Sequence, residues 1–480
     1  MARGRMEFLE KDEIDRIDAM SIRILAELGL SIRSEKVLRL LEGEGCVRSK
    51  DRERILIPED VVRSAVSNRS GKTVLLASTD KKHDISIPCG RTFMANGGEA
   101  VYVKNLITGK RHPSTIEDVI DFTILADRLP QIDFLWTMSG ATEQPPHLKE
   151  LLEQRISLEY STKHYQGGAL TAEQAKDMVD VASVLSGGAK ELEKRPIFSA
   201  IQCPISPLTF EGSVAEAQVE LARAGIPVVA MSAPIAGITS PVTLSGTIAQ
   251  TNAENLASLV ISQAGKKGAP FIYSSDSSPA DMKTGSIDYG GIESPLMYAG
   301  CGQMGRHYRL PIMTAGASVA EASVLLGTVQ EGVPLMMVEA INRSDLGSAF
   351  GGIDNALGAS LEQMVADAWI WEYAREFGRD FMADEDAISF ETIRTVIKGG
   401  SYLGQPHTMR NFRKENLAAA RPEMGSPERG VSGDRGALIK KARTEAERIL
   451  KGPRKKYVTE GESRELDALF RKFRGALPTA

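Results

Sequence analysis

The feature that most constrains the fold of this chain is a regular alternation between short apolar, β-branched runs and longer amphipathic segments. Such alternation is typical of βα units, which build a parallel sheet covered by helices. We count eight candidate strands, which are Thr92–Asn96, Asp133–Ser139, His164–Ala169, Ile197–Cys203, Pro227–Ser232, Pro270–Ser275, Pro311–Ala315 and Leu335–Ala340.

The segments between these runs place apolar residues at three- and four-residue steps, which predicts amphipathic helices. Eight such units over about 280 residues predict an α/β fold of the (β/α)8 TIM barrel class, whose typical size is ~250 residues. A doubly wound sheet is the alternative, and it would normally carry a Gly-rich phosphate turn between its first strand and a helix. The run ANGGEA at 95–100 is not followed by a helical pattern, so the barrel is favoured.

The barrel is expected to span residues 91–383, with a mainly helical extension on each side. Residues 1–90 combine two helical patterns with a β-prone stretch that contains TVLLAS, so we predict helices and a β-hairpin there. Residues 384–480 predict helices, interrupted by the Pro/Gly/Ser-rich run RPEMGSPERGVSGDRG.

Charge and composition narrow the class of protein. The formal net charge is −5, and 17 Lys/Arg against 10 Asp/Glu from residue 411 onward leave −12 for residues 1–410. An acidic body argues against a nucleic-acid-binding protein. The charged N-terminus has no apolar signal-peptide core, and the most apolar stretch, 310–329, is broken by Pro, Gly and Glu, so no membrane association is expected. Four widely spaced cysteines indicate reduced thiols in a cytoplasmic protein.

In a (β/α)8 enzyme the catalytic groups lie at the carboxyl ends of the strands and in the loops that follow. This rule selects a set of polar and aromatic candidates, with a structural hydrogen bond or core packing as the alternative role of each. They are Asn96, Glu99, Trp136, Ser139, Tyr165, Gln166, Gln202, Cys203, Ser232, Tyr273, Asp276, Glu339, Asn342 and Phe350.

Asp276 and Glu339 are the predicted catalytic residues. Each carboxylate follows an apolar run, where burial is costly unless a cation or a hydrogen-bond donor compensates it. Aromatic rings at the same rim could hold a quaternary ammonium group by cation–π attraction. With the acidic body, these residues favour a small cationic ligand over a phosphate or a polyanion.

A metal site is not predicted. The six histidines do not fall at ligand spacing with cysteine or carboxylate partners. His407 stands out among them because it lies in the polar run GQPHTMRNFR. A lyase or aldolase that forms a Schiff base is also disfavoured, because none of the eight candidate strands carries a lysine in its C-terminal half.

Four stretches carry a resemblance to a known family. They are VYVKNLITGKRHPSTIEDVIDFTILADRLPQIDF, MSAPIAGITSPVTLSGTIAQTNAENLA at 231–257, GAPFIYSSDSS, and GGSYLGQPHTMRNFR at 399–413. Together they resemble the trimethylamine methyltransferase family of corrinoid-dependent enzymes. The chain has no pyrrolysine, so it is similar to the branch that contains glycine betaine methyltransferase. In the loop after the seventh strand, TAGASVAEASVLLGTVQEGV departs from the usual family pattern.

The resemblance implies a (β/α)8 methyltransferase that moves an N-methyl group from a quaternary amine, such as a betaine, to the Co(I) of a separate corrinoid protein. No tightly bound cofactor is implied in the chain itself, and a homo-oligomer is expected. We assign the cationic head of a betaine to Asp276, Glu339, Tyr273 and Phe350, and its carboxylate to Asn96, Gln202, Asn342 or His407. His407 could instead cap the C-terminal segment against the barrel. The alternative function is a non-catalytic barrel that binds or senses a betaine.

Overall fold

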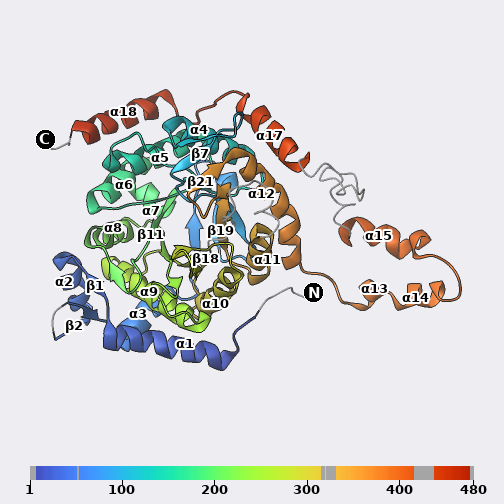
Figure 1. Ribbon diagram of the computed structural model, residues 1–480, viewed down its shortest axis with the longest axis horizontal. Helices are drawn as coiled ribbons and strands as arrows, with labels where there is room; N and C mark the ends of the chain where they lie inside the picture. Colours follow the sequence, from blue (N-terminus) through green and yellow to red (C-terminus); the bar gives the residue numbers. More distant parts are fainter. Residues whose placement is uncertain (1–6, 51–52, 315–318, 320–330, 416–436, 476–480) are drawn as a thin grey trace.

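The computed structural model describes residues 7–50, 53–314, 319, 331–415 and 437–475. Its centre is an eight-stranded parallel sheet that curls into a barrel (Figure 1). In spatial order the strands are β6 (Phe93–Asn96), β19 (Leu346–Phe350), β18 (Ile312–Thr314), β15 (Phe271–Ser275), β13 (Val228–Ser232), β11 (Phe198–Gln202), β10 (Tyr165–Gly168) and β9 (Leu135–Trp136).

The two outer strands of this order, β6 and β9, meet and close the barrel. A parallel bridge joins Ala95 to Phe134, just before β9. On either side of it, Asp133 accepts the N–H of Met94, and the side-chain oxygen of Asn96 accepts the N–H of Trp136. The (β/α)8 barrel predicted from the sequence is therefore confirmed.

The prediction for the eighth strand was wrong. The run Leu335–Ala340 lies in a helix, α11 (Val333–Asn342), and the eighth strand is β19. Pro334 in the first turn suits a helix start, since proline has no N–H to lose there. The helix buries Leu335, Met336, Glu339 and Ala340, which share one helical face.

Helices cover the outside of the barrel. They are α4 (Ile116–Arg128), α5 (Pro146–Tyr160), α6 (Ala172–Ser186), α7 (Ala189–Lys194), α8 (Gly212–Arg223), α9 (Leu244–Gly265), α10 (Glu293–His307), α11, and α12 (Leu361–Ala374), which is followed by η4 (Arg375–Gly378). Local sequence sets several of their starts. Thr115, for example, caps α4 in a reciprocal pair of hydrogen bonds with Asp118.

A β-hairpin closes the N-terminal end of the barrel. Its strands are β4 (Val74–Leu76) and β5 (Ile85–Ile87), linked by η2 (Lys81–His83). Its apolar side chains share one cluster with residues inside the barrel, such as Val229 and Ile272. Because this end is filled, a cavity can form only toward the carboxyl ends of the strands.

The rest of the N-terminal segment packs on the barrel near α9. It comprises α1 (Lys11–Arg23), η1 (Ile24–Leu28), α2 (Glu35–Gly43), α3 (Glu59–Arg69) and two strand pairs, β2 (Val47–Arg48) with β3 (Ile55–Leu56) and β1 (Ser31–Ile32) with β12 (Thr209–Phe210). The boundaries predicted at residues 90 and 383 remain predictions.

Two small sheets lie on the loops at the carboxyl ends of the barrel strands. One contains β7 (Tyr102–Lys104), β8 (Arg111–Pro113), β20 (Gly352–Ile353) and β21 (Gly358–Ser360). The other contains β14 (Ile235–Ala236), β16 (Ser278–Asp281) and β17 (Ser286–Ile287). They give the loops around the barrel mouth a hydrogen-bonded framework.

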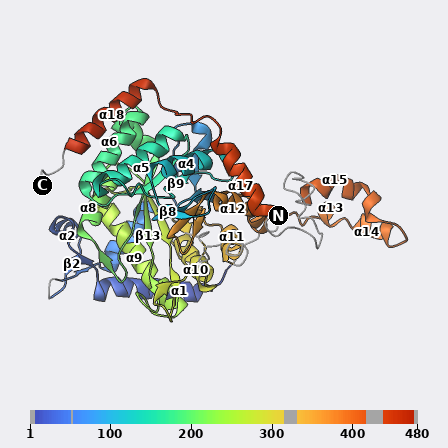
Figure 2. The same cartoon turned by 45° about the horizontal axis from the view of Figure 1, so that its top comes forward.

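The C-terminal segment leaves the barrel and returns to it. Residues 384–415 form an arm that extends from the body in both views (Figures 1 and 2), with α13 (Glu385–Ile388), α14 (Phe390–Val396), η5 (Tyr402–Gly404) and α15 (Pro406–Glu415). The helices α17 (Ala437–Leu450) and α18 (Glu460–Gly475) then pack on the barrel helices. Within the described residues, no helix has the length and apolar character needed to span a membrane.

Candidate active site

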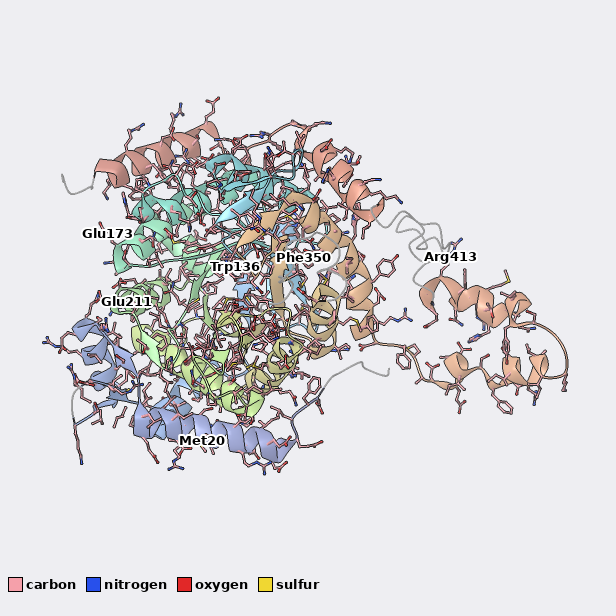
Figure 3. All side chains as sticks on the ribbon, viewed as in Figure 1. Met20, Trp136, Glu173, Glu211, Phe350 and Arg413 are labelled. Carbon is pink, nitrogen blue, oxygen red and sulfur yellow. The ribbon has the colours of Figure 1, made fainter. Side chains whose placement is uncertain are left out.

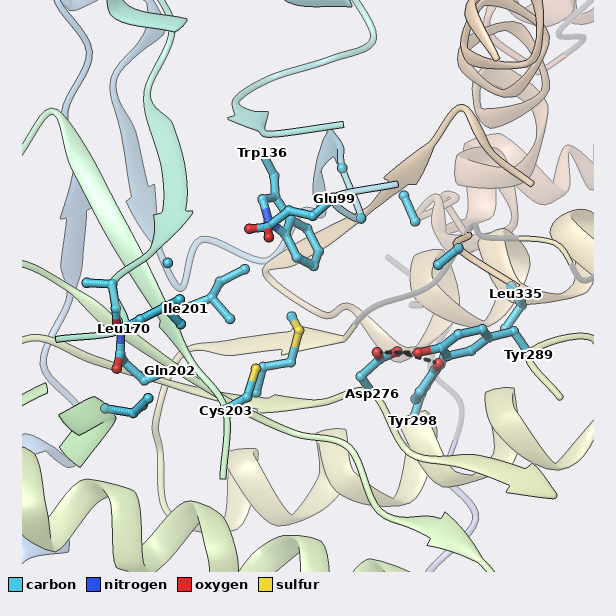
Figure 4. A pocket seen from close by; sticks show the side chains of 18 residues that line it. Glu99, Trp136, Leu170, Ile201, Gln202, Cys203, Asp276, Tyr289, Tyr298 and Leu335 are labelled. Atoms are coloured by element: carbon cyan, nitrogen blue, oxygen red, sulfur yellow. Dashed lines mark hydrogen bonds between the residues drawn. The ribbon is translucent and has the colours of Figure 1, made fainter. Parts of the chain in front are cut away.

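A pocket of about 340 Å³ opens at the carboxyl ends of the barrel strands, within the usual range for small-ligand sites. Figure 4 shows its lining side chains. The lining residues come from seven of the eight strands or the loops after them, and from α8, α10 and α11. They are Gly97, Gly98, Glu99, Trp136, Gly168, Ala169, Leu170, Ile201, Gln202, Cys203, Val214, Met231, Asp276, Tyr289, Tyr298, Leu335, Ala349 and Ala356.

Asp276 is one of two carboxylates in this pocket. It follows β15 directly, and its two oxygens accept hydrogen bonds from the hydroxyls of Tyr289 (2.8 Å) and Tyr298 (3.2 Å). Burial raises the pKa of Asp276 to about 6, and the two hydrogen bonds oppose part of that rise. The carboxylate therefore carries its charge at neutral pH, and the side chains that hydrogen-bond it in the described structure are the two neutral tyrosines.

Glu99 is the second carboxylate, and it lies in the loop after β6 beside Trp136 (Figure 4). Its side chain is 3.5 Å from Lys149 on α5, and the same ammonium lies 3.8 Å from Glu153. Burial raises the pKa of Glu99 above its usual range, while Lys149 opposes the rise. Burial also raises the pKa of Glu153 to about 8, so Glu153 is protonated at neutral pH and Lys149 serves mainly Glu99.

Trp136 forms one wall of the pocket, and Gly97 makes room for it. A Cβ atom on Gly97 would lie 2.6 Å from the indole ring, and the φ of Gly97 is +131°, a region that disfavours side chains. The indole is thus seated directly over the backbone at the end of β6.

Gln202 lines the pocket at the end of β11. Its amide nitrogen donates to the carbonyl of Ala169 (3.1 Å), which leaves the amide oxygen buried and without a partner. Because a carbonyl can only accept, this contact fixes which end of the amide faces Ala169.

Of the predicted catalytic residues, Asp276 lines the pocket and Glu339 does not. Glu339 is buried on α11 and accepts a 2.6 Å hydrogen bond from Thr314 at the end of β18. Burial raises the pKa of Glu339 to about 8, so this carboxyl is neutral at pH 7. Asn342, at the end of the same helix, bonds Arg306 and Ser344. Glu339 and Asn342 were predicted to lie at the end of a strand, but this segment forms the helix α11.

Two of the predicted aromatic residues face away from the pocket. Tyr273 lies between β15 and α9, where its hydroxyl donates to Asn252. Phe350 packs with Met364 and Val365 of α12. Asn96 is buried and bonds the backbone of Trp136, so it joins β6 to β9 instead of facing a ligand.

His407 lies on α15 in the arm, not at the pocket. Figure 3 shows Arg413 of the same helix well separated from Trp136. Of the predicted substrate-binding residues, only Gln202 lines the described pocket together with Asp276.

Strand-end reasoning proposed Glu99, Trp136 and Cys203 as candidates, and all three line the pocket. It missed Tyr289 and Tyr298, which lie beyond strand ends, one in the loop before α10 and one within that helix. The spacing of apolar residues could predict that Tyr298 lies in a helix, but it could not predict that its hydroxyl points toward Asp276.

No group of three or more His, Cys, Asp or Glu residues in the described part of the chain is arranged to hold a metal ion. The pocket has the size for a small amine flanked by carboxylates and rings. A corrin ring is far larger, so a corrinoid would have to approach the mouth from outside.

Comparisons with known proteins identify the family of the chain. The family model for trimethylamine methyltransferase (MTTB) matches residues 2–475. The trimethylamine methyltransferase MttB of Desulfitobacterium hafniense (strain DSM 10664 / DCB-2) is 26% identical over 406 residues, which cover 84% of this chain and 82% of the relative. The glycine betaine methyltransferase of Desulfitobacterium hafniense (strain Y51) is 26% identical over 413 residues, covering 86% and 85%.

Among solved structures, the monomethylamine methyltransferase MtmB of Methanosarcina barkeri covers 98% of this chain and 95% of its own, with 12% identity and a TM-score of 0.48. The family match extends over nearly the whole chain, including the pocket and the arm. The chain belongs to the trimethylamine methyltransferase (MTTB) family, whose members transfer methyl groups to corrinoid proteins.

Proposed function

We propose that this chain transfers an N-methyl group from a quaternary amine to the cobalt of a separate corrinoid protein. The observation that carries the proposal is the pocket itself, in which Asp276 and Glu99 lie with aromatic rings at the open end of the barrel. A permanent cation is the ligand that such a pocket attracts. Glycine betaine or a related betaine is one such amine, as the sequence resemblance implies.

The docked corrinoid supplies Co(I) as the nucleophile, which bonds to the methyl carbon as the C–N bond breaks and its electron pair returns to nitrogen. A quaternary nitrogen leaves as a neutral tertiary amine, so the chain needs no proton donor for this step. The task of the protein is to hold one methyl group toward the mouth and to exclude water.

The carboxylates serve binding more than acceleration. The positive charge on nitrogen disappears as the bond breaks, so Asp276 and Glu99 stabilise the bound amine more than the transition state. Their removal should therefore raise KM more than it lowers kcat.

The loops at the mouth support docking of a partner protein. Several apolar side chains on the loops after β13, β15 and β19 are exposed there, namely Ile238, Val242, Met282, Ile292 and Leu357. Exposed apolar residues gathered at one end of a molecule are typical of an interaction surface. We assign this surface to the corrinoid protein.

The arm supports the proposal of a homo-oligomer. Helices of four, seven and ten residues are too short to be stable in isolation, and none of them buries a residue in this chain. Large apolar side chains are exposed along it, with Leu403 84% and Met409 77% exposed. A second copy of the chain is the partner we assign, because the arm extends away from the body and presents these apolar side chains to the outside (Figure 1).

The decisive experiment mixes the full-length protein with a Co(I) corrinoid protein and a panel of N-methyl amines. Visible absorption reports loss of Co(I), and mass spectrometry identifies the demethylated amine. Asp276→Asn should raise KM by about tenfold or more, since it removes a charge beside the bound cation. Glu465→Gln, an exposed carboxylate on α18, is the matched control. Binding of an amine without any methyl transfer would instead favour a non-catalytic barrel.

A further inference from the structure

The charged side chains that line the pocket are all acidic. Glu99 and Asp276 are the two, and the described lining residues include no Lys, Arg or His. A betaine would bring its own carboxylate into this space. That carboxylate would meet two like charges, and like charges in a site of low dielectric repel strongly.

The hydrogen-bonding atoms show the same bias. The hydroxyls of Tyr289 and Tyr298 are already directed at Asp276. The indole of Trp136 lies on the same wall as Glu99, and its hydrogen bond acts to lower the pKa of that carboxyl. A single indole N–H does not offset two carboxylates, because one neutral hydrogen bond contributes only about 1 kcal/mol.

Lys149 is the nearest ammonium group, and it is already paired. Its Nζ lies 3.5 Å from Glu99 and 3.8 Å from Glu153, behind the lining. It partly neutralises Glu99 but leaves Asp276 uncompensated.

The residues that follow β18 in the sequence supply no positive charge either. Residues 315–330 contain no Lys, Arg or His and one acidic residue, Glu321. The chain thus offers no cationic group from these residues to receive a carboxylate.

We propose that the pocket selects a quaternary ammonium compound that carries no anionic group over a zwitterionic betaine. This inference rests on the proposed function for the identity of the site and narrows its substrate class to amines of net charge +1. Choline is the matched probe. Choline and glycine betaine share the trimethylammonium head and differ chiefly in a hydroxymethyl against a carboxylate.

Isothermal titration calorimetry on the full-length protein tests the selection without any methyl transfer. Choline should bind at least about tenfold more tightly than glycine betaine. The neutral carbon isostere 3,3-dimethylbutanol should bind more weakly than choline, because it lacks the cationic head. Equal affinities, tighter binding of glycine betaine, or no measurable binding of choline would each overturn the proposal.

Glu99→Gln provides a second arm of the test. The substitution leaves Lys149 without its pocket-side carboxylate, so the ratio of the choline to the glycine betaine affinity should fall by about tenfold. Glu465→Gln should leave that ratio unchanged. The Co(I) assay separates the two proposals. Selective binding of choline without methyl transfer would contradict the proposed function alone. Methyl transfer from glycine betaine in preference to choline would contradict the charge selection alone.

Discussion

Tyr298 donates its hydroxyl to Asp276 across 3.2 Å, although the tyrosine lies within α10 and the carboxylate directly follows β15. Tyr289 donates to the other oxygen of the same carboxylate. The pair orients Asp276 and holds it charged, but neither hydroxyl neutralises it. The negative charge is therefore available to a ligand cation.

The first prediction concerns the pH dependence of cation binding. Asp276 has a pKa of about 6, above the usual value, so affinity for tetramethylammonium should fall as the pH falls through about 6. Tyr298→Phe removes a hydrogen bond that lowers this pKa, so the midpoint should move to higher pH, by up to about one unit. Calorimetric titrations between pH 5 and pH 8 measure this midpoint in the natural chain and in the variant. Tyr457→Phe, which removes a hydroxyl bonded to the surface residue Asp127, should leave the midpoint in place.

The second prediction concerns the position of the Trp136 indole, which packs against Gly97. Gly97→Ala should displace Trp136 and weaken amine binding, and should also destabilise the fold by roughly 1 kcal/mol or more from its positive φ alone. Gly188→Ala is the control for backbone strain, because Gly188 has a φ of +116° with open space around its Cβ position. Thermal unfolding and amine affinity are measured for both variants and for the natural chain. A similar affinity in both variants would contradict the role assigned to Gly97.

The third prediction concerns Glu339. Its pKa of about 8 lies above the ordinary value, so the folded state binds one more proton than the unfolded state at intermediate pH. The contribution of this carboxyl to stability is present at low pH and is lost as the pH rises toward 8. Glu339→Gln cannot ionise, so its stability should depend less on pH, with a gain over the natural chain of at least about 1.4 kcal/mol at pH 9. Urea unfolding of both proteins at pH 5 and pH 9 measures this difference. The same difference in unfolding free energy at the two pH values would contradict the prediction.

The fourth prediction concerns the arm. Replacing Leu403 and Met409 by Asp should shift the protein toward the monomer, because it places charges on side chains assigned to a contact with a second copy. Light scattering coupled to gel filtration measures the mass at several concentrations. Ile107→Asp, on an equally exposed side chain of the β7–β8 loop (80% exposed), should leave the mass unchanged. A natural chain that is monomeric at all concentrations would contradict the oligomer.

The strand-end candidates show how far local pattern reaches. Asp276 and Glu99 follow β15 and β6, Gln202 ends β11, and the geometry of a parallel barrel brings such strand ends to one mouth. Leu335–Ala340 failed because six mainly apolar residues fit a buried strand and a buried helix equally well. The sequence also could not decide whether a strand residue points into the barrel or outward. All residues of β15 are buried, so the strand has no polar–apolar alternation that would predict the outward direction of Tyr273.

The sequence by itself determined the barrel, because periodicity and strand-end position are properties of neighbouring residues along the chain. It also determined that the body is acidic and that residues 315–330 add no cation. Only the tertiary structure decided that Tyr289 and Tyr298 meet Asp276, that Lys149 pairs with Glu99, and that His407 lies on an arm apart from the pocket. Those contacts join elements that are remote or differently shaped in sequence, and packing alone fixes their distances.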